Sequence, residues 1–465
     1  MGGPAVDTDA VRTGAVETLA TRRGEVRSLT GLRLFAAAWV VVFHFEFTPG
    51  AGFVEAVKHV RAIVGVGSLG VDLFYVLSGF VIAFTYLDRM GPKLDVRLSW
   101  RFIWARVSRV WPVFAVVTNL FGLWLLAKLT LGDGDIAFQK IQPEMSFTSW
   151  LRQMFMVQMW SQPYFDGSSW VGPAWSISAE WAAYVLFPLT ALVYFRLGRL
   201  PAGVLAGLAV LTVTPIAVIS GVTGNPYFPY SWLVRIGVGF TSGVLVYLAI
   251  RHIPLTDRVR RAASWATVAV LAGIVAGLFV GDSMIGMREG DGEHGGMVMV
   301  LFPVLVAALA LSVGRGPARL LSTNWAVHGG RISYSLYLVH IPVFEVIWTL
   351  MIRYRFIGPD TPGGVALAFA GLVSVFVAAH LLWRFVEEPA RQRMRRLTDR
   401  PRVAERAATE PTAEAAAADP RPDVHAEAAT PEPTPEGSPA VDVEHLVEGL
   451  APGGAEVGPE AVRRR

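Results

Sequence analysis

The sequence contains no cysteine and few charged residues for its length. Without a thiol, it can hold no disulfide, no thiolate metal site and no cysteine nucleophile. Charged residues make up 17% of the 465 residues, whereas roughly a quarter of a soluble domain is charged. Mean hydropathy is +0.45, and many apolar runs reach the roughly 20 residues that a helix needs to cross a bilayer. These features exclude an ordinary soluble protein and indicate an integral membrane protein.

The basic residues stand at the borders of the apolar segments. Because they do not gather in one patch, a pI of about 9.4 does not indicate binding to nucleic acid. Residues 1–28 are polar, with no short apolar core and cleavage site before Leu29. They are predicted to be a cytoplasmic segment that leads into an uncleaved first span.

The apolar runs predict an all-α fold, a polytopic transmembrane bundle of about ten helices. Each span should be helical because backbone amides find no water in hydrocarbon. The predicted spans are residues 30–48, 68–87, 107–127, 174–195, 202–221, 230–250, 263–281, 297–313, 333–352 and 365–386. With the N-terminus in the cytoplasm, the loops on that side hold roughly three times as many Lys and Arg as the other loops. This bias predicts a cell-membrane protein with both termini in the cytoplasm.

The transmembrane domain is predicted to cover residues 29–396. The remainder, residues 397–465, is rich in Ala, Pro and Glu. Such a tail buries too little apolar surface to offset its chain entropy, so it is predicted to be disordered. The one long loop on the outer side covers about residues 131–173. Its aromatic and methionine-rich stretch at 148–160 predicts a short interfacial helix.

The first span, LTGLRLFAAAWVVVFHF, carries two ionisable residues, Arg33 and His44. Ionisable groups are costly in a bilayer unless they are paired or solvated, which makes each a candidate functional residue. Their spacing is about three helical turns, so the two side chains face the same way, roughly 16 Å apart along the axis. Taken singly, Arg33 could simply reach the interface and His44 could be a satisfied core histidine. The shared face favours a function.

The second span, GSLGVDLFYVLSGFVIAF, places Asp72 at a depth similar to that of His44. If the two helices pack together, Asp72 could orient the His44 imidazole and stabilise its protonated form. Equally, the carboxylate could cap the start of its own helix. Ser78 is a weaker candidate, because Ser78 and Gly79 are small residues that are expected to allow close helix packing and not to carry chemistry.

The third span begins RFIWARVSRVWPVF, where Arg106 and Arg109 are neighbours on one helical face. Arginine makes bidentate contacts with phosphate, so this pair could bind an anionic ligand. The alternative is ordinary positive flanking of a span at its cytoplasmic border.

The fourth and ninth spans add further candidates. Glu180 lies in the outer half of WSISAEWAAYVLFP, too deep for a surface explanation, whereas Trp175 could belong to an aromatic belt. Tyr337 and His340 are three residues apart in RISYSLYLVHIP. For these two, a structural hydrogen bond within the bundle is the preferred interpretation.

Sorted by predicted depth, the ionisable residues form two groups. The inner group is Arg33, Arg106, Arg109 and Arg331, and the outer group is His44, Asp72 and Glu180. A cationic inner mouth and an outer acid–base site suggest an anionic cytosolic donor and an acceptor in or beyond the outer half.

Six motifs together resemble the acyltransferase-3 family of multi-span membrane acyltransferases. They are RSLTGLRLFAAAWVVVFH, GVDLFYVLSGFVIAF, FIWARVSRVWPVF, PAWSISAEWAAYVLFP, GRISYSLYLVHIP and WRFVEEPARQ, in order and with compatible spacing over about residues 28–396. The departures of this sequence from the family's motifs are minor. Ala179 stands where Val is usual, and Ala182 and Ala183 stand where a bulkier pair often follows the tryptophan.

This resemblance implies a membrane O-acyltransferase that takes its acyl group from acetyl-CoA or another acyl-CoA, without a metal. By similarity, Arg33 and His44 are the catalytic Arg–ten residues–His signature, Arg106 and Arg109 are linked to the acyl-CoA donor, and Glu180 is the carboxylate of the fourth motif. The acceptors that the resemblance implies are hydroxyls of envelope glycans, glycolipids or small natural products such as macrolides.

The mechanistic hypothesis makes His44 a general base toward the acceptor hydroxyl, with Asp72 or Glu180 steadying the charge. A covalent acyl-histidine relay is an open alternative. A transporter of a small anionic solute would also have about ten spans with buried charges, although the sequence shows no inverted halves. A structural scaffold would have no need for ionisable groups at several depths.

Overall fold

The computed structural model of this chain describes residues 17–22, 24–50, 60–132, 135–285 and 293–399. In this described part the chain is helical or irregular, without a β-strand, as predicted. The last described helix ends at Asp399. Almost all of the predicted tail therefore lies outside the described residues, and its disorder stays a prediction.

Ten helical segments among the described residues are long and apolar enough to cross a membrane, which confirms the predicted number. They are Arg27–Phe45, Leu69–Met90, Val96–Leu131, Gly172–Leu197, Ala202–Thr223, Ser231–Ile250, Asp257–Met284, His294–Leu311, Asn324–Arg353 and Pro362–Leu397. The third has 36 residues, or roughly 54 Å at 1.5 Å per residue. It must extend beyond a hydrocarbon layer about 30 Å thick.

Several spans are composed of consecutive helical elements. The elements of the ten spans are α1 (Arg27–Phe45), α4 (Leu69–Ile82), η3 (Ala83–Leu87), α5 (Asp88–Met90), α6 (Val96–Leu131), η4 (Gly172–Ala174), α8 (Trp175–Leu197), α9 (Ala202–Thr223), α10 (Ser231–Ile250), α11 (Asp257–Ile285), η5 (His294–Leu301), α12 (Phe302–Leu311), α14 (Asn324–Arg353), α15 (Pro362–Leu382), η7 (Trp383–Glu387) and α16 (Glu388–Asp399). The short connecting helices are α3 (Arg61–Val64), α7 (Phe147–Met154), α13 (Gly316–Leu321) and η6 (Arg355–Ile357).

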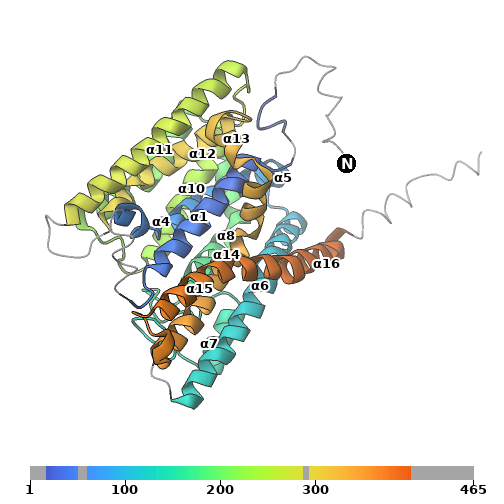
Figure 1. The fold of residues 1–465 in the computed structure, drawn as a ribbon. Helices are drawn as coiled ribbons and strands as arrows, with labels where there is room; N and C mark the ends of the chain where they lie inside the picture. The colour runs from blue at the N-terminus through green and yellow to red at the C-terminus, as the bar shows by residue number, and fades with distance from the viewer. Residues whose placement is uncertain (1–16, 23, 51–59, 133–134, 286–292, 400–465) are drawn as a thin grey trace, which may run out of the picture. The chain divides into compact units, whose positions relative to one another are not determined.

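Helix α1 lies between α4 and α14, in the middle of the described part (Figure 1). A Cβ added to Gly330 of α14 would stand 1.8 Å from the carbonyl oxygen of Thr30, so only glycine permits this approach. Farther along both helices, the rings of Phe45 and Phe344 lie 5.5 Å apart. The two helices therefore run parallel, and the ionisable residues of the first and ninth spans come together.

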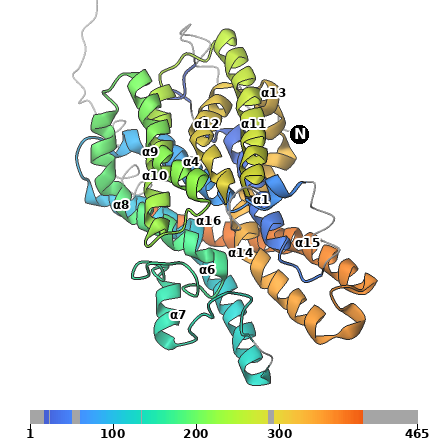
Figure 2. The ribbon, with the colours of Figure 1, turned by 90° about the vertical axis from the view of Figure 1, so that its left-hand side faces the viewer.

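Helices α4 and α10 also pack backbone to backbone (Figure 2). A Cβ on Gly79 would stand 1.9 Å from the carbonyl oxygen of Phe240, and one on Gly243 would stand 2.0 Å from that of Val76. The prediction that Gly79 serves close helix packing is confirmed.

The chain between α7 and α8 is partly buried inside the bundle, unlike a surface loop. The helix predicted at 148–160 covers only Phe147–Met154, and the irregular chain that follows buries Gln158, Met159 and Ser169 within the bundle. The Gln158 side chain donates to the carbonyl oxygen of Ala174 at 3.2 Å. Irregular backbone is tolerated inside a membrane protein where its polar groups find protein partners in this way.

Candidate functional site

A cavity of about 660 Å³, here called the wide cavity, opens where α1 ends. Its walls include His44 on α1, Tyr337 on α14 and Trp175 at the start of α8. Residues 135–140 and Glu293 contribute from loops at the same end. Such a space can hold a substrate of the size of a small organic molecule or part of a larger one.

His44 is fixed in the wall of the wide cavity through one ring nitrogen. Its Nδ1 lies 2.9 Å from the carbonyl oxygen of Val40 and 3.2 Å from Nε2 of His340. A carbonyl oxygen can only accept, so these contacts place the proton on His44 Nδ1 and the lone pair on Nε2. His340 agrees with this assignment, because its own Nδ1 donates to the carbonyl oxygen of Tyr337 at 2.6 Å and leaves its Nε2 as an acceptor. The arrangement leaves Nε2 of His44 to receive a proton from a ligand.

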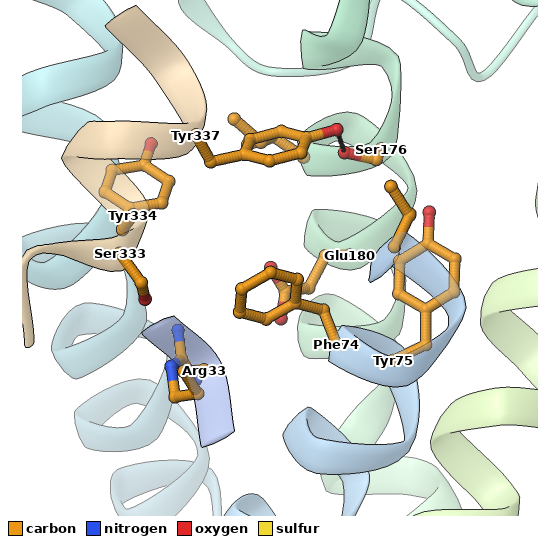
Figure 3. A pocket seen from close by; sticks show the side chains of 10 residues that line it. Arg33, Phe74, Tyr75, Ser176, Glu180, Ser333, Tyr334 and Tyr337 are labelled. Atoms are coloured by element: carbon orange, nitrogen blue, oxygen red, sulfur yellow. Dashed lines mark hydrogen bonds between the residues drawn. The ribbon is translucent and has the colours of Figure 1, made fainter. Parts of the chain in front are cut away.

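A second, narrow cavity of about 40 Å³ surrounds Arg33, closer to the start of α1 (Figure 3). Its walls include Phe74 and Tyr75 of α4 and Glu180 of α8. The Arg33 guanidinium lies 5.3 Å from the centre of the Phe74 ring, and in the part of the chain that the structure describes it makes no hydrogen bond or ion pair. This cation remains available for an anionic ligand.

Glu180 faces the narrow cavity with Arg33, not the wide cavity with His44 (Figure 3). Its carboxylate accepts hydrogen bonds from Ser78 and, at 2.6 Å, from the Tyr184 hydroxyl. The predicted grouping of Glu180 with the outer residues is therefore wrong. The physical reason is that α8 packs with Glu180 against Ser78, which lies farther along α4 than Asp72.

Asp72 is paired with Arg235 of α10. The two form a bidentate, buried ion pair, with oxygen–nitrogen distances of 2.9 and 2.6 Å. The rings of Trp175 and Tyr227 cover the Arg235 guanidinium at 5.5 and 5.4 Å. Asp72 therefore does not orient His44, as one sequence interpretation expected, nor does its side chain cap its own helix. The groups that contact Nδ1 of His44 are the Val40 carbonyl oxygen and Nε2 of His340.

Arg106 and Arg109 on α6 are each bound to a different protein group. Arg109 forms an ion pair with the buried Glu387, whose other oxygen accepts from Ser335 at 2.7 Å. Arg106 donates to the Tyr86 hydroxyl at 3.0 Å, while its buried Nε has no partner among the described residues. The two partners, Glu387 and Tyr86, lie in the π-helical turns η7 and η3, a type of turn that is frequent at functional sites.

Tyr337 and Ser176 stand where the two cavities meet. The Tyr337 hydroxyl lies 2.7 Å from the Ser176 hydroxyl and donates to the carbonyl oxygen of Pro173 at 2.9 Å. The structural hydrogen bonds expected of Tyr337 and His340 are thus present, and Tyr337 also borders both cavities. Trp175 stacks on Phe165 at 5.0 Å in the wall of the wide cavity.

Glu293 is a buried carboxylate of the wide cavity that sequence reasoning did not select. It accepts from the Tyr227 hydroxyl at 2.7 Å and from the Ser68 hydroxyl at 3.1 Å. Burial raises the pKa of Glu293 above its ordinary value, against the opposing effect of these hydrogen bonds and of Arg235. Burial and the Glu293 charge likewise raise the pKa of Tyr227.

Other charged residues that were overlooked lie within the spans themselves. Lys128 and Glu345 form a buried ion pair at 3.0 Å, and Arg235 pairs with Asp72. The rule that selected His44, an ionisable group inside an apolar segment, would also have found Arg235 and Glu345. Among the described residues, no group of three or more His, Asp or Glu is placed to hold a metal ion.

Comparison with known proteins agrees with the fold and the motifs. The acyltransferase domain of the acyltransferase-3 family matches residues 26–384. The chain is 28% identical to the acyltransferase MdmB of Streptomyces mycarofaciens over 393 residues, which are 78% of this chain and 90% of MdmB. It is 23% identical to the peptidoglycan O-acetyltransferase OatA of Listeria monocytogenes over 396 residues, 80% of this chain and 56% of OatA. The O-acetyltransferase OatA of Staphylococcus aureus is also 23% identical, over 78% of this chain and 57% of that protein. No solved structure matches.

The ten spans and the family match together define a multi-pass membrane acyltransferase. The chain belongs to the acyltransferase-3 family, because the family's domain covers most of its length. The resemblance in the six motifs is thereby confirmed. The chain spans a little over half the length of the OatA relatives, so what those proteins act on is not transferred to it by similarity alone.

Proposed function

We propose that this protein transfers an acyl group, with acetyl as the expected one, from cytosolic acyl-CoA to a hydroxyl of an envelope glycan, glycolipid or small natural product. The acceptor would bind in the wide cavity and the donor would approach from the side of Arg33. The protein would act in the cell membrane, with the wide cavity on the outer face.

The observation that supports this proposal most strongly is the state of His44. Its Nδ1 is engaged by Val40 and His340, so the basic nitrogen is Nε2, and the side chain lines a cavity large enough for an acceptor. In the proposed reaction, Nε2 removes the proton of the acceptor hydroxyl, the oxygen attacks the thioester carbonyl, and the CoA thiolate leaves. An acyl-histidine intermediate is the alternative route, in which Nε2 itself attacks the carbonyl.

The donor side of the proposal depends on the arginines. Arg33 is a guanidinium without a hydrogen bond or ion pair among the described residues, beside the Glu180 carboxylate. It could bind a polar or anionic part of the arm that carries the thioester. Arg106 and Arg109 could bind the CoA phosphates at the cytoplasmic border. For Arg109 this requires that phosphate shares or replaces the contact with Glu387.

The direct test is acyl transfer by purified protein from labelled acetyl-CoA to candidate acceptors. His44→Ala should lower kcat by about 10² to 10⁴, the range of general-base catalysis, with unchanged folding. Arg33→Met should mainly raise the KM for acyl-CoA, because it removes a cation that makes no hydrogen bond or ion pair among the described residues. Both variants should elute from a sizing column like the wild type.

Two outcomes would contradict the proposal. Well-folded His44→Ala with normal transfer would exclude the assigned base. Movement of a small anion across sealed vesicles without consumption of acyl-CoA would favour a transporter instead.

A further inference from the structure

The two cavities are separate and share one layer of lining side chains. Val71 and Tyr337 line both of them. Arg33 belongs only to the narrow cavity, and His44 only to the wide one. Since the two residues are roughly 16 Å apart along the helix axis, a donor that reaches from the first to the second must pass this layer.

Tyr337 is the side chain that spans the layer. Its ring extends from α14 toward α8, where its hydroxyl meets Ser176 (Figure 3). Ser176 and Tyr337 both lie at hydrogen-bond distance from the carbonyl oxygen of Pro173, at 3.0 and 2.9 Å. The ring of Phe74 packs edge to face against Tyr337 at 6.4 Å. Side chains of α4, α8 and α14 thus meet in this layer, and Tyr337 contacts the other two helices.

Tyr337 is held in this layer by hydrogen bonds and ring contacts. Among the described residues, it takes part in no ion pair. Its ring also lies 5.8 Å from the His340 ring, so the layer adjoins the pair of histidines in the wide cavity. A group that enters from the narrow cavity and bonds to Ser176 would displace the Tyr337 hydroxyl.

We propose that Tyr337, tethered by Ser176 and Pro173, is a partition between the narrow cavity of the donor and the wide cavity of the acceptor, and that the thioester arm of acyl-CoA opens it. The inference rests on the proposed function, because it takes acyl-CoA as the ligand that enters beside Arg33. The closed partition keeps water of the wide cavity from the donor side until the acyl group arrives. Tyr337 is in this sense a positioning residue and takes no part in proton transfer.

The natural lack of cysteine allows a sharp test with single cysteines. Ser333→Cys reports on the narrow cavity, which Ser333 lines while it is fully buried. Phe47→Cys is the matched control in the wide cavity, where Phe47 is 58% exposed. A membrane-impermeant maleimide is applied only from the face where α1 ends. Ser333→Cys should react slowly, and at least tenfold faster when Tyr337→Ala is added, while Phe47→Cys should react at the same rate in both backgrounds.

Two milder changes keep the test valid if Tyr337→Ala disturbs folding. Tyr337→Phe and Ser176→Ala each remove one hydroxyl, so each should raise the labelling rate of Ser333→Cys severalfold. The same substitutions should increase hydrolysis of acetyl-CoA in the absence of acceptor.

Rapid labelling of Ser333→Cys with Tyr337 intact, or a rate that none of the substitutions changes, would overturn the partition. Labelling does not require acyl transfer, so this failure is distinct from failure of the proposed function. If His44→Ala abolishes transfer while Ser333→Cys is labelled at the same rate with and without the substitutions at Tyr337 and Ser176, only the partition is wrong. If His44→Ala retains transfer, the assignment of the base is wrong whatever the labelling shows.

Discussion

At the scale of single residues, His44, the proposed general base, contacts a second histidine in addition to the backbone of its own helix. A carboxylate behind a histidine stabilises the imidazolium, and the sequence suggested that arrangement for Asp72 and His44. In the structure a neutral acceptor, Nε2 of His340, takes that place. His340 is fully buried and held by the backbone of its own helix. The pair therefore selects a tautomer of His44 without adding negative charge to the site.

A pair of substitutions at His340 tests this role. His340→Gln offers an amide oxygen that can still accept from Nδ1 of His44, whereas His340→Leu offers none. The leucine variant should lose about tenfold or more in kcat, and the glutamine variant should recover part of that loss. KM for acyl-CoA should change little in either variant. Steady-state kinetics at several acceptor concentrations separate these effects, and equal loss in both variants would indicate a packing role only.

At the scale of helices, three ion pairs link spans to one another, and two of them are fully buried. Asp72 and Arg235 link α4 to α10, Lys128 and Glu345 link α6 to α14, and a third pair links α6 to η7. Each pair satisfies two charges that would be costly if left alone in a low-dielectric interior.

Removal of one partner should destabilise the α4–α10 pairing. Asp72→Asn leaves the Arg235 guanidinium buried without its counter-charge, at a cost of about 3–5 kcal/mol. The double variant Asp72→Leu with Arg235→Met removes both charges and should regain much of that stability. Thermal unfolding in detergent of Asp72→Leu, Arg235→Met and the double variant measures the coupling free energy between the two side chains. If the Asp72→Asn protein is stable but has a low kcat, Asp72 would instead have a role in the reaction at His44.

At the scale of the molecule, the parallel course of α1 and α14 brings residues far apart in sequence into the walls of the two cavities. The wide cavity opens at the end of α1, and the narrow cavity lies nearer its start. The distribution of Lys and Arg predicts that the start of α1 faces the cytoplasm. The donor and the acceptor would then reach the two cavities from opposite sides of the membrane.

Labelling of intact cells tests this orientation. Phe356, 77% exposed after α14, should lie outside, and Arg199, exposed after α8, should lie inside. With an impermeant maleimide, Phe356→Cys should react in intact cells, and Arg199→Cys should react only after permeabilisation. The reverse pattern would invert the topology and place the wide cavity on the cytoplasmic side.

The sequence determined the features that depend on local pattern. Apolar runs set the number and approximate bounds of the ten spans, because the length of a spanning helix is fixed by the thickness of the bilayer. Helical periodicity placed Arg33 and His44 on one face of α1, and the six motifs indicated the family that the domain match confirmed. The prediction for Gly79 also held, since a residue without a side chain inside a span marks a close approach.

Only the tertiary structure decided which charged groups meet. Asp72 could have turned to His44 or to Arg235, and the choice depends on α10 packing against α4, which no pattern within one span encodes. Glu180 lies with Arg33 because α8 packs with this carboxylate against Ser78, farther along α4 than Asp72. His340 reached His44 because α14 runs parallel to α1 at the distance of a glycine contact. Neighbours of this kind follow from how whole helices pack, so they lie beyond what local spacing can specify.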